Sequence, residues 1–202
     1  MRKRISGKMD LRRQIERYIP WNEQEAADRE EILRQLNQDN IFTRDNKAAH
    51  MTASAWVVNR SRDKALMAYH NIYHSWSWLG GHADGEEDLL ASAIREVREE
   101  SGVHGVKPLS DDIFSLEILT VDGHEKKGVY VPSHLHLNVT YLLEADEKEP
   151  LSMKPDENSG VAWFALLDAV KASTEPWFQE RIYTKLNQKL TEWVMKHESV
   201  QF

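Results

Sequence analysis

Three glutamates in one short segment suggest the chemistry of this chain. Glu96 and Glu100 are four residues apart and Glu99 lies between them, so an α-helix would place all three carboxylates within roughly one quadrant of its surface. Carboxylates this close repel one another, and a hard divalent cation with oxygen ligands, Mg²⁺ or Mn²⁺, would relieve the repulsion. Arg95 could orient Glu96 through a charge-assisted hydrogen bond. The alternative is a solvated acidic helix face, which is common for charged runs.

The residues around these glutamates predict the helix that positions them. A glycine-rich loop, Gly80 to Gly85, comes first, and its glycines permit positive φ angles and a close approach of backbone to a ligand. Acidic residues at 86–88 suit the first turn of a helix, and Gly102 stands where a C-terminal cap is expected. The apolar side chains of Leu90, Ala93, Ile94 and Val97 share a neighbouring face that should pack on a core.

This segment resembles a complete Nudix box. The pattern G-x5-E-x7-R-E-U-x-E-E-x-G-U, where U is aliphatic, is met at every fixed position from Gly81 to Val103, with Glu87 as its first glutamate. Such a match is highly specific, although it covers only a small part of the chain.

The resemblance implies an α/β fold, a Nudix-type α/β/α sandwich with a mixed β-sheet. It also implies a hydrolase that cleaves a nucleoside diphosphate linked to another moiety, using Mg²⁺ or Mn²⁺ and an attacking water. The expected partner is therefore a small-molecule nucleoside-diphosphate derivative.

The resemblance also assigns roles to residues. Glu96, Glu99 and Glu100 would bind the metal together with the backbone carbonyl of Gly80, Arg95 would orient Glu96, and Glu87 would help to position a water or the metal shell. One carboxylate would accept a proton from the attacking water. Glu99 is the first choice for this base. Glu157 is a second candidate, because some relatives recruit a downstream glutamate, although an exposed loop acid is an equal alternative.

Three further side chains are candidates for substrate contact. Trp78 belongs to an aromatic cluster just before the box and could stack on a base, although core packing is an alternative. His82 lies inside the glycine-rich loop. His136 belongs to residues 134–143, where apolar and polar side chains alternate as in a strand, so its polar face would line a ligand cleft or face solvent.

Two other functions stay open. The segment from Trp78 to His82 faintly resembles the corresponding segment of an isopentenyl-diphosphate isomerase. The chemistry of that enzyme normally uses a cysteine, and this chain has none. A non-catalytic Nudix domain that senses a nucleotide is also conceivable, but such domains commonly lose box carboxylates, and all are present here.

Composition narrows the class of protein. The net charge of -7 argues against nucleic acid as the main partner, and no apolar run is long enough to span a membrane. The absence of cysteine excludes disulfides, thiolate metal sites and a cysteine nucleophile. A cytoplasmic location is expected.

Two regions are predicted along the chain. Residues 1–45 read as a helical extension with helices ending at Pro20 and starting after Asn22, where Glu25 completes a capping box. This extension could cover the domain, shape the pocket or form a homodimer contact. Residues 46–202 would form the Nudix domain, with strands at 50–59, 64–70, 114–121, 134–143 and 161–164 and a short strand around Trp76 and Trp78. The charged loop at 124–128 is either a flexible lip near phosphate or a solvated hairpin tip. A helix is expected at 166–172, followed by a C-terminal helix capped by Thr174.

Overall fold

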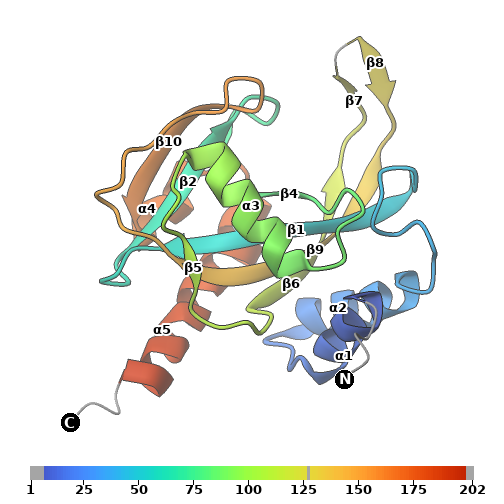
Figure 1. Cartoon of the computed structure of the whole chain (residues 1–202), viewed down its shortest axis with the longest axis horizontal. Helices are drawn as coiled ribbons and strands as arrows, with labels where there is room; N and C mark the ends of the chain where they lie inside the picture. The colour runs from blue at the N-terminus through green and yellow to red at the C-terminus, as the bar shows by residue number, and fades with distance from the viewer. Residues whose placement is uncertain (1–6, 127, 199–202) are drawn as a thin grey trace, which may run out of the picture. The chain divides into compact units, whose positions relative to one another are not determined.

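The computed structural model describes residues 7–126 and 128–198 (Figure 1). The helical segments are α1 (Gly7–Arg17), α2 (Glu23–Gln35), α3 (Leu89–Ser101), α4 (Leu166–Ala172), a π-helical segment η1 (Phe178–Tyr183) and α5 (Thr184–Glu198). The strands are β1 (Ala49–Val58), β2 (Lys64–His70), β3 (Ser75–Ser77), β4 (Leu79–His82), β5 (Lys107–Pro108), β6 (Ser115–Val121), β7 (His124–Lys126), β8 (Val129–Val131), β9 (His134–Glu144) and β10 (Asn158–Ala165). Among the described helices, none is long and apolar enough to cross a membrane.

An eight-stranded sheet is the central element of the fold. Its strand order is β10-β2-β1-β9-β5, with β3 paired to β2, β4 to β1 and β6 to β9. The expected strands and the helix at 166–172 are present close to their predicted bounds.

The chain divides into two compact units. Unit 1 comprises the chain up to Ser54, Gly80–Ala93 and Asp111–Tyr141, and unit 2 comprises Ala55–Leu79, Ile94–Ser110 and the chain from Leu142 onward. β1, α3 and β9 each begin in unit 1 and end in unit 2. The boundary between residues 45 and 46 that the sequence suggests stays a prediction.

In unit 1 the N-terminal helices are tied to strand β6 by a buried carboxylate. Asn22 caps α2 as predicted, accepting a hydrogen bond from the Glu25 backbone nitrogen at 2.9 Å. The fully buried Glu25 side chain accepts from the Tyr18 hydroxyl at 2.6 Å, the Trp21 backbone nitrogen at 2.7 Å and the Ser115 hydroxyl at 2.8 Å. The inner face of α2 is therefore partly polar. The first helix, expected to end at Pro20, ends at Arg17, and Ile19 beyond it is 86% exposed.

The polar face of β9 is buried where the sequence left a choice between a cleft and solvent. The Asn138 side-chain oxygen accepts hydrogen bonds from the Thr52 hydroxyl at 3.0 Å and the Ser54 hydroxyl at 2.9 Å. Its amide donates to Glu117 at 3.2 Å, and the Thr140 hydroxyl donates to the same carboxylate at 3.1 Å. At Asn138 and Thr140, the solvated-face interpretation is therefore wrong, because neighbouring strands supply the hydrogen bonds that water would otherwise make.

Residues 124–128 were expected to form either a flexible lip near phosphate or a solvated hairpin tip, and the described residues on both sides of position 127 form a hairpin. β7 and β8 pair as an antiparallel hairpin separate from the main sheet. Gly128 has a φ of 77°, which suits the turn between the strands. Val129 and Tyr130 on β8 are 67% and 70% exposed, so the hairpin presents apolar side chains to solvent.

In unit 2 the C-terminal helical segment packs against aromatic side chains. The rings of Trp56 and Tyr183 stack with centroids 5.6 Å apart, and both side chains are fully buried. The expected cap at Thr174 is wrong. Ser173 instead accepts a hydrogen bond from the Glu175 backbone nitrogen at 3.3 Å, while the Thr174 backbone nitrogen donates to Ser75 at 2.9 Å.

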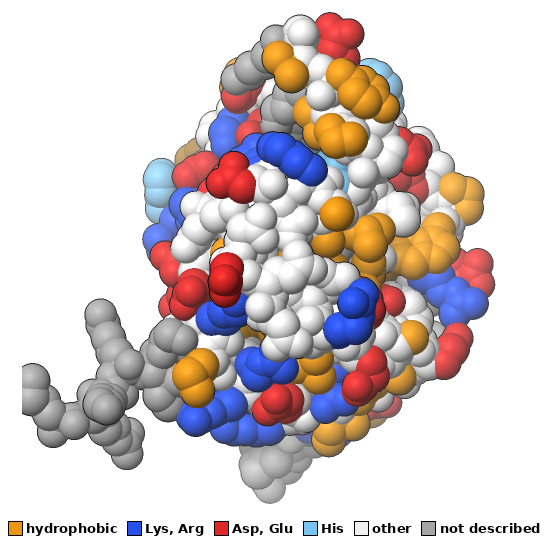
Figure 2. Space-filling model, turned by 90° about the vertical axis from the view of Figure 1, so that its right-hand side faces the viewer, with side chains coloured by type: hydrophobic (Ala, Val, Ile, Leu, Met, Phe, Trp, Pro, Cys, Tyr) orange, Lys and Arg blue, Asp and Glu red, His pale blue; other side chains and the backbone are white. Residues whose placement is uncertain are grey.

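Acidic and basic side chains are interspersed on the face drawn in Figure 2. Over the whole sequence acidic side chains are in excess, with a net charge of -7.

Replacing Glu25 by alanine should destabilise the protein. The change removes a buried acceptor that two hydroxyls and one backbone N–H share, so we expect the free energy of unfolding to fall by about 2–4 kcal/mol. Urea unfolding followed by circular dichroism measures the change. Glu16→Ala is the matched control, because Glu16 lies on the exposed side of α1 with a long 3.9 Å contact to Arg12. Equal unfolding midpoints for the two variants would contradict the role of Glu25.

Candidate functional site

Helix α3 is fixed at both ends by the residues that flank it. Asp88 caps its start, with its carboxylate accepting from the Ala91 backbone nitrogen at 3.0 Å. Its end is followed by Gly102 at a φ of 73°, as the sequence predicted. A Cβ atom at Gly102 would lie 2.1 Å from the Ser152 hydroxyl oxygen, so a larger residue would also force the Ser152 side chain to move.

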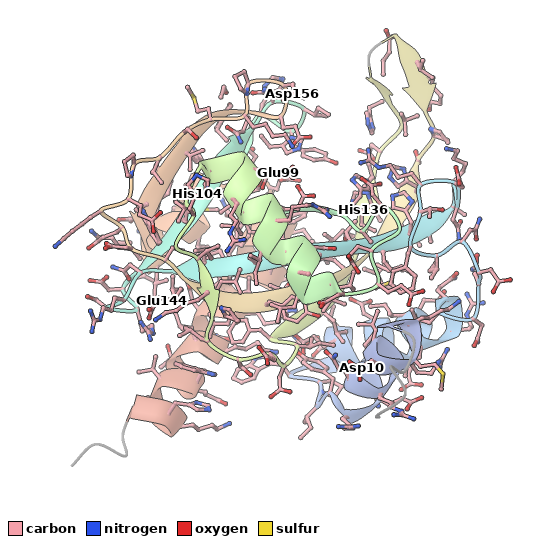
Figure 3. The ribbon with its side chains drawn as sticks, in the orientation of Figure 1. Asp10, Glu99, His104, His136, Glu144 and Asp156 are labelled. Atoms are coloured by element: carbon pink, nitrogen blue, oxygen red, sulfur yellow. The ribbon has the colours of Figure 1, made fainter. Side chains whose placement is uncertain are left out.

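The last turns of α3, which belong to unit 2, carry the three glutamates. Glu96 and Glu100 are only 9% and 6% exposed, whereas the Glu99 side chain is about half exposed and extends from α3 in Figure 3. Burial raises the pKa of Glu96, and its hydrogen bond from Arg95 acts in the opposite direction. That bond is 2.8 Å long and is the contact that the sequence suggested for Arg95.

Lys154 brings the two candidate bases together. Its ammonium lies 3.2 Å from a carboxylate oxygen of Glu99 and 2.9 Å from one of Glu157. Burial acts to lower the pKa of Lys154, but the hydrogen bonds to Glu157 and Glu99 outweigh it and raise the pKa, so this side chain stays cationic. Sequence reasoning missed Lys154. Its spacing of three residues from Glu157 was the only available signal.

The loop that carries Lys154 is anchored to the end of α3. The Ser152 backbone nitrogen donates to the carbonyl of Ser101 at 2.8 Å, and the Asn158 side chain donates to the carbonyl of Glu100 at 3.0 Å. Both bonds use carbonyls of the last helical turn, which lack partners inside the helix. The position of Glu157 therefore depends on the helix that carries Glu99.

The donor chemistry of this carboxylate cluster (Glu96, Glu99 and Glu100) fits a hard divalent cation. Its ligand atoms are carboxylate oxygens, the kind that Mg²⁺ and Mn²⁺ prefer. The pKa of Glu96 is raised because the hydrogen bond from Arg95 does not fully offset the burial of its carboxylate. A bound cation would stabilise the ionised form of this side chain.

Unit 1 contains two other residues with a predicted role near the metal, Gly80 just before the box and Glu87 within it. Gly80 lies in β4, where an added Cβ would be 2.5 Å from the carbonyl oxygen of Ala53 on β1, so only glycine fits. The Glu87 carboxylate accepts a hydrogen bond from the Lys8 backbone nitrogen at 2.7 Å, in the first turn of α1. This hydrogen bond links Glu87 to the start of α1. The role of Glu87 toward a water or a metal stays a prediction.

The predicted substrate contacts fall into both units. In unit 1, the rings of His82 and His136 lie 4.8 Å apart, with His50 and His134 beside them. In unit 2, Trp78 is 8% exposed and its ring meets Tyr183 edge-on at 5.9 Å, so it is packed as a core residue. The prediction that Trp78 contacts substrate remains untested.

Comparison with known proteins identifies the family. A family model described as NUDIX domain matches residues 48–186, well over half of the chain. A curated relative from Lactococcus lactis subsp. cremoris, named probable DHNTP pyrophosphohydrolase, is 26% identical over 140 residues, which cover 69% of this chain and 81% of that protein.

Solved structures share the fold. An Ap4A hydrolase of C. elegans, solved as a binary complex, is 20% identical and superposes with a TM-score of 0.53. The match covers 72% of this chain and 98% of the hydrolase chain. A MutT protein from Methanosarcina mazei Go1 is 15% identical, with a TM-score of 0.51 and coverages of 71% and 96%. These likenesses confirm the predicted fold class, a Nudix-type arrangement of helices around a mixed sheet. The match of the family model, together with the complete box on and around α3, shows that this chain belongs to the Nudix family of hydrolases, which act on pyrophosphate bonds.

Proposed function

We propose that this protein is a Mg²⁺- or Mn²⁺-dependent pyrophosphohydrolase that cleaves a nucleoside diphosphate linked to another moiety. The observation that carries the proposal is the carboxylate cluster on α3, where two buried glutamates and one half-exposed glutamate share a side of the helix. The curated relative is also named a pyrophosphohydrolase, which supports the same reaction.

Glu96, Glu99 and Glu100 would hold the cation, with the Gly80 carbonyl as the resemblance implies. When bound, such a cation neutralises diphosphate charge and lowers the pKa of a bound water. Arg95 keeps the Glu96 carboxylate in one orientation through its 2.8 Å hydrogen bond. Glu87 would help to position the water, as in the sequence prediction.

Glu99 is our choice for the group that accepts the proton of the attacking water. Its carboxylate is the most exposed of the three, so a water can reach it. Glu157 is the second candidate, because Lys154 holds its carboxylate beside that of Glu99. The Lys154 ammonium pairs with both carboxylates, and a carboxylate oxygen can accept the proton of a water.

A small molecule is the proposed substrate. We keep the sequence prediction that His82, His136 and Trp78 contact the substrate. A cytoplasmic location and a homodimer contact through the N-terminal helices also stay predictions.

Replacing Glu100 by glutamine should nearly abolish turnover. The change removes one anionic ligand with almost no change in volume, so we expect kcat/KM to fall at least about a hundredfold while the fold is kept. Product release is measured with Mg²⁺ or Mn²⁺ on a panel of ADP-ribose, other nucleotide sugars, dinucleoside polyphosphates, nucleoside triphosphates, DHNTP and isopentenyl diphosphate.

Glu192→Gln is the matched control for this substitution, because Glu192 is an exposed glutamate on α5. Metal-dependent cleavage of one compound, lost in Glu100→Gln and kept in the control, identifies reaction and substrate together. Equal turnover in Glu100→Gln and the parent would overturn the metal assignment. Nucleotide binding without any cleavage would favour a nucleotide-sensing domain. A reaction with isopentenyl diphosphate alone would favour an isomerase.

The two candidate bases can be separated by comparing Glu99→Gln with Glu157→Gln at saturating Mn²⁺. We expect Glu99→Gln to lower kcat by about 10²–10⁴-fold, the usual contribution of a general base, and Glu157→Gln to lower it less than tenfold. The pH profile of kcat provides a second measurement, since the variant without the base should lose the acidic limb. The opposite order of the two variants would assign the base to Glu157.

A further inference from the structure

Four histidines from three strands converge in unit 1. His50 lies on β1, His82 ends β4, and His134 and His136 lie two residues apart on β9. One ring nitrogen of each lies within 4.8 Å of those of the others. The alternation along a strand puts His134 and His136 on one face of β9. Of these four histidines, Figure 3 labels His136, which is half-buried.

Backbone hydrogen bonds fix the three strands within two residues of these side chains. The nitrogen of Leu135, between the two β9 histidines, donates to the carbonyl of Ala48 at 2.9 Å. The nitrogen of Ala83, next to His82, donates to the carbonyl of Met51 at 3.1 Å. The convergence of the imidazoles is therefore determined by the sheet.

The hydrogen bonds of two rings leave their Nε2 lone pairs pointing into the cluster. The His50 Nδ1 lies 3.0 Å from the carbonyl oxygen of Asn46, and the His134 Nδ1 lies 2.9 Å from that of Pro132. A carbonyl oxygen only accepts, so each Nδ1 carries the proton and each Nε2 is an acceptor. The same arrangement of a backbone carbonyl behind a ring orients histidine ligands in metal sites.

One of these lone pairs is buried without a partner. His50 is 4% exposed, and its Nε2 has no hydrogen bond within the described structure. An unpaired buried acceptor is unfavourable, and most are explained by an ion or a water. The Nε2 atoms of His134 and His136 face each other at 3.1 Å. A cation among the four rings would satisfy all of these nitrogens.

The charge of a neighbouring arginine is compensated, so the cluster suits a metal better than a phosphate. The guanidinium of Arg44 is paired with the Asp84 carboxylate at 2.7 and 2.5 Å, so its charge is largely compensated. The Nε2 atoms of His50 and His134 face the cluster as acceptors, so they offer lone pairs to a cation.

We propose that His50, His82, His134 and His136 bind a transition-metal ion, Zn²⁺ in the first instance, at a site separate in chemistry from the carboxylate cluster. Imidazole nitrogens suit Zn²⁺, Cu²⁺ and Ni²⁺, whereas Mg²⁺ prefers oxygen ligands. In a tetrahedral zinc site with Zn–N bonds of about 2.0–2.1 Å, the ligand nitrogens are about 3.3 Å apart. The His134–His136 separation of 3.1 Å is already close to that value. The ion would cross-link β1, β4 and β9 within unit 1.

The proposal predicts binding of one Zn²⁺ or Co²⁺ per chain. The full-length protein is stripped with a chelator and titrated by calorimetry with excess Mg²⁺ present, which occupies oxygen-ligand sites. Co²⁺ provides a spectroscopic readout, because a tetrahedral nitrogen site gives strong visible absorption. Zn²⁺ should also raise the Tm, since it binds the folded chain.

Two ligand variants and two controls test the site. His82→Gln and His134→Gln remove half-buried ligands, and each should weaken Zn²⁺ and Co²⁺ binding by at least about tenfold while circular dichroism stays native. His104→Gln, at an exposed histidine of unit 2, should bind like the parent. Glu100→Gln should also keep the Co²⁺ spectrum, which separates this site from the proposed catalytic cation.

The proposal is overturned if the parent shows no tetrahedral Co²⁺ absorption. It is equally overturned if folded His82→Gln and His134→Gln bind Zn²⁺ as tightly as His104→Gln. Either result would leave the proposed hydrolase function untouched, because that function rests on the glutamates of α3.

Discussion

A polar side chain that is taken out of water needs another partner, and both units of this protein are arranged around that requirement. In unit 1, Glu25 gathers donors from α1, α2 and β6, and Asn138 joins hydroxyls of β1 to the carboxylate of Glu117. In unit 2, Glu96 is buried beside Arg95, and the pKa of Glu96 is still raised. The structural networks of unit 1 are satisfied by protein groups, whereas the glutamates of α3 suit an added cation.

The sequence was most informative where a local pattern determines structure. The spacing of the box and the stop at Gly102 define α3 without any distant contact, and Asp88, which was expected in the first turn, caps the helix instead. The bounds of β2 and α4 also follow from short-range periodicity and agree with the prediction. Local steric and hydrogen-bonding rules act within a few residues, so one sequence is enough to read them.

The sequence was least informative where partners are far apart along the chain. Lys154 meets Glu99 across 55 positions, and the hydroxyls that make Asn138 a buried residue come from β1, more than 80 positions away. An alternating polar face looks the same whether water or another strand covers it. The histidine cluster was missed for the same reason, since His50 looked like an ordinary strand residue until β9 was placed beside it.

The contact between Glu87 and the start of α1 links a family motif to a segment outside the family match. The family model begins at residue 48, yet Glu87 accepts a hydrogen bond from the backbone of Lys8. Gly7 leaves no room for a side chain, because an added Cβ would lie 2.6 Å from the Cβ of Glu87. Among homologues that carry this extension, position 7 should therefore stay glycine as long as Glu87 is kept. The N-terminal helix and the box loop are then under shared evolutionary constraint, and the extension cannot drift as an independent appendage.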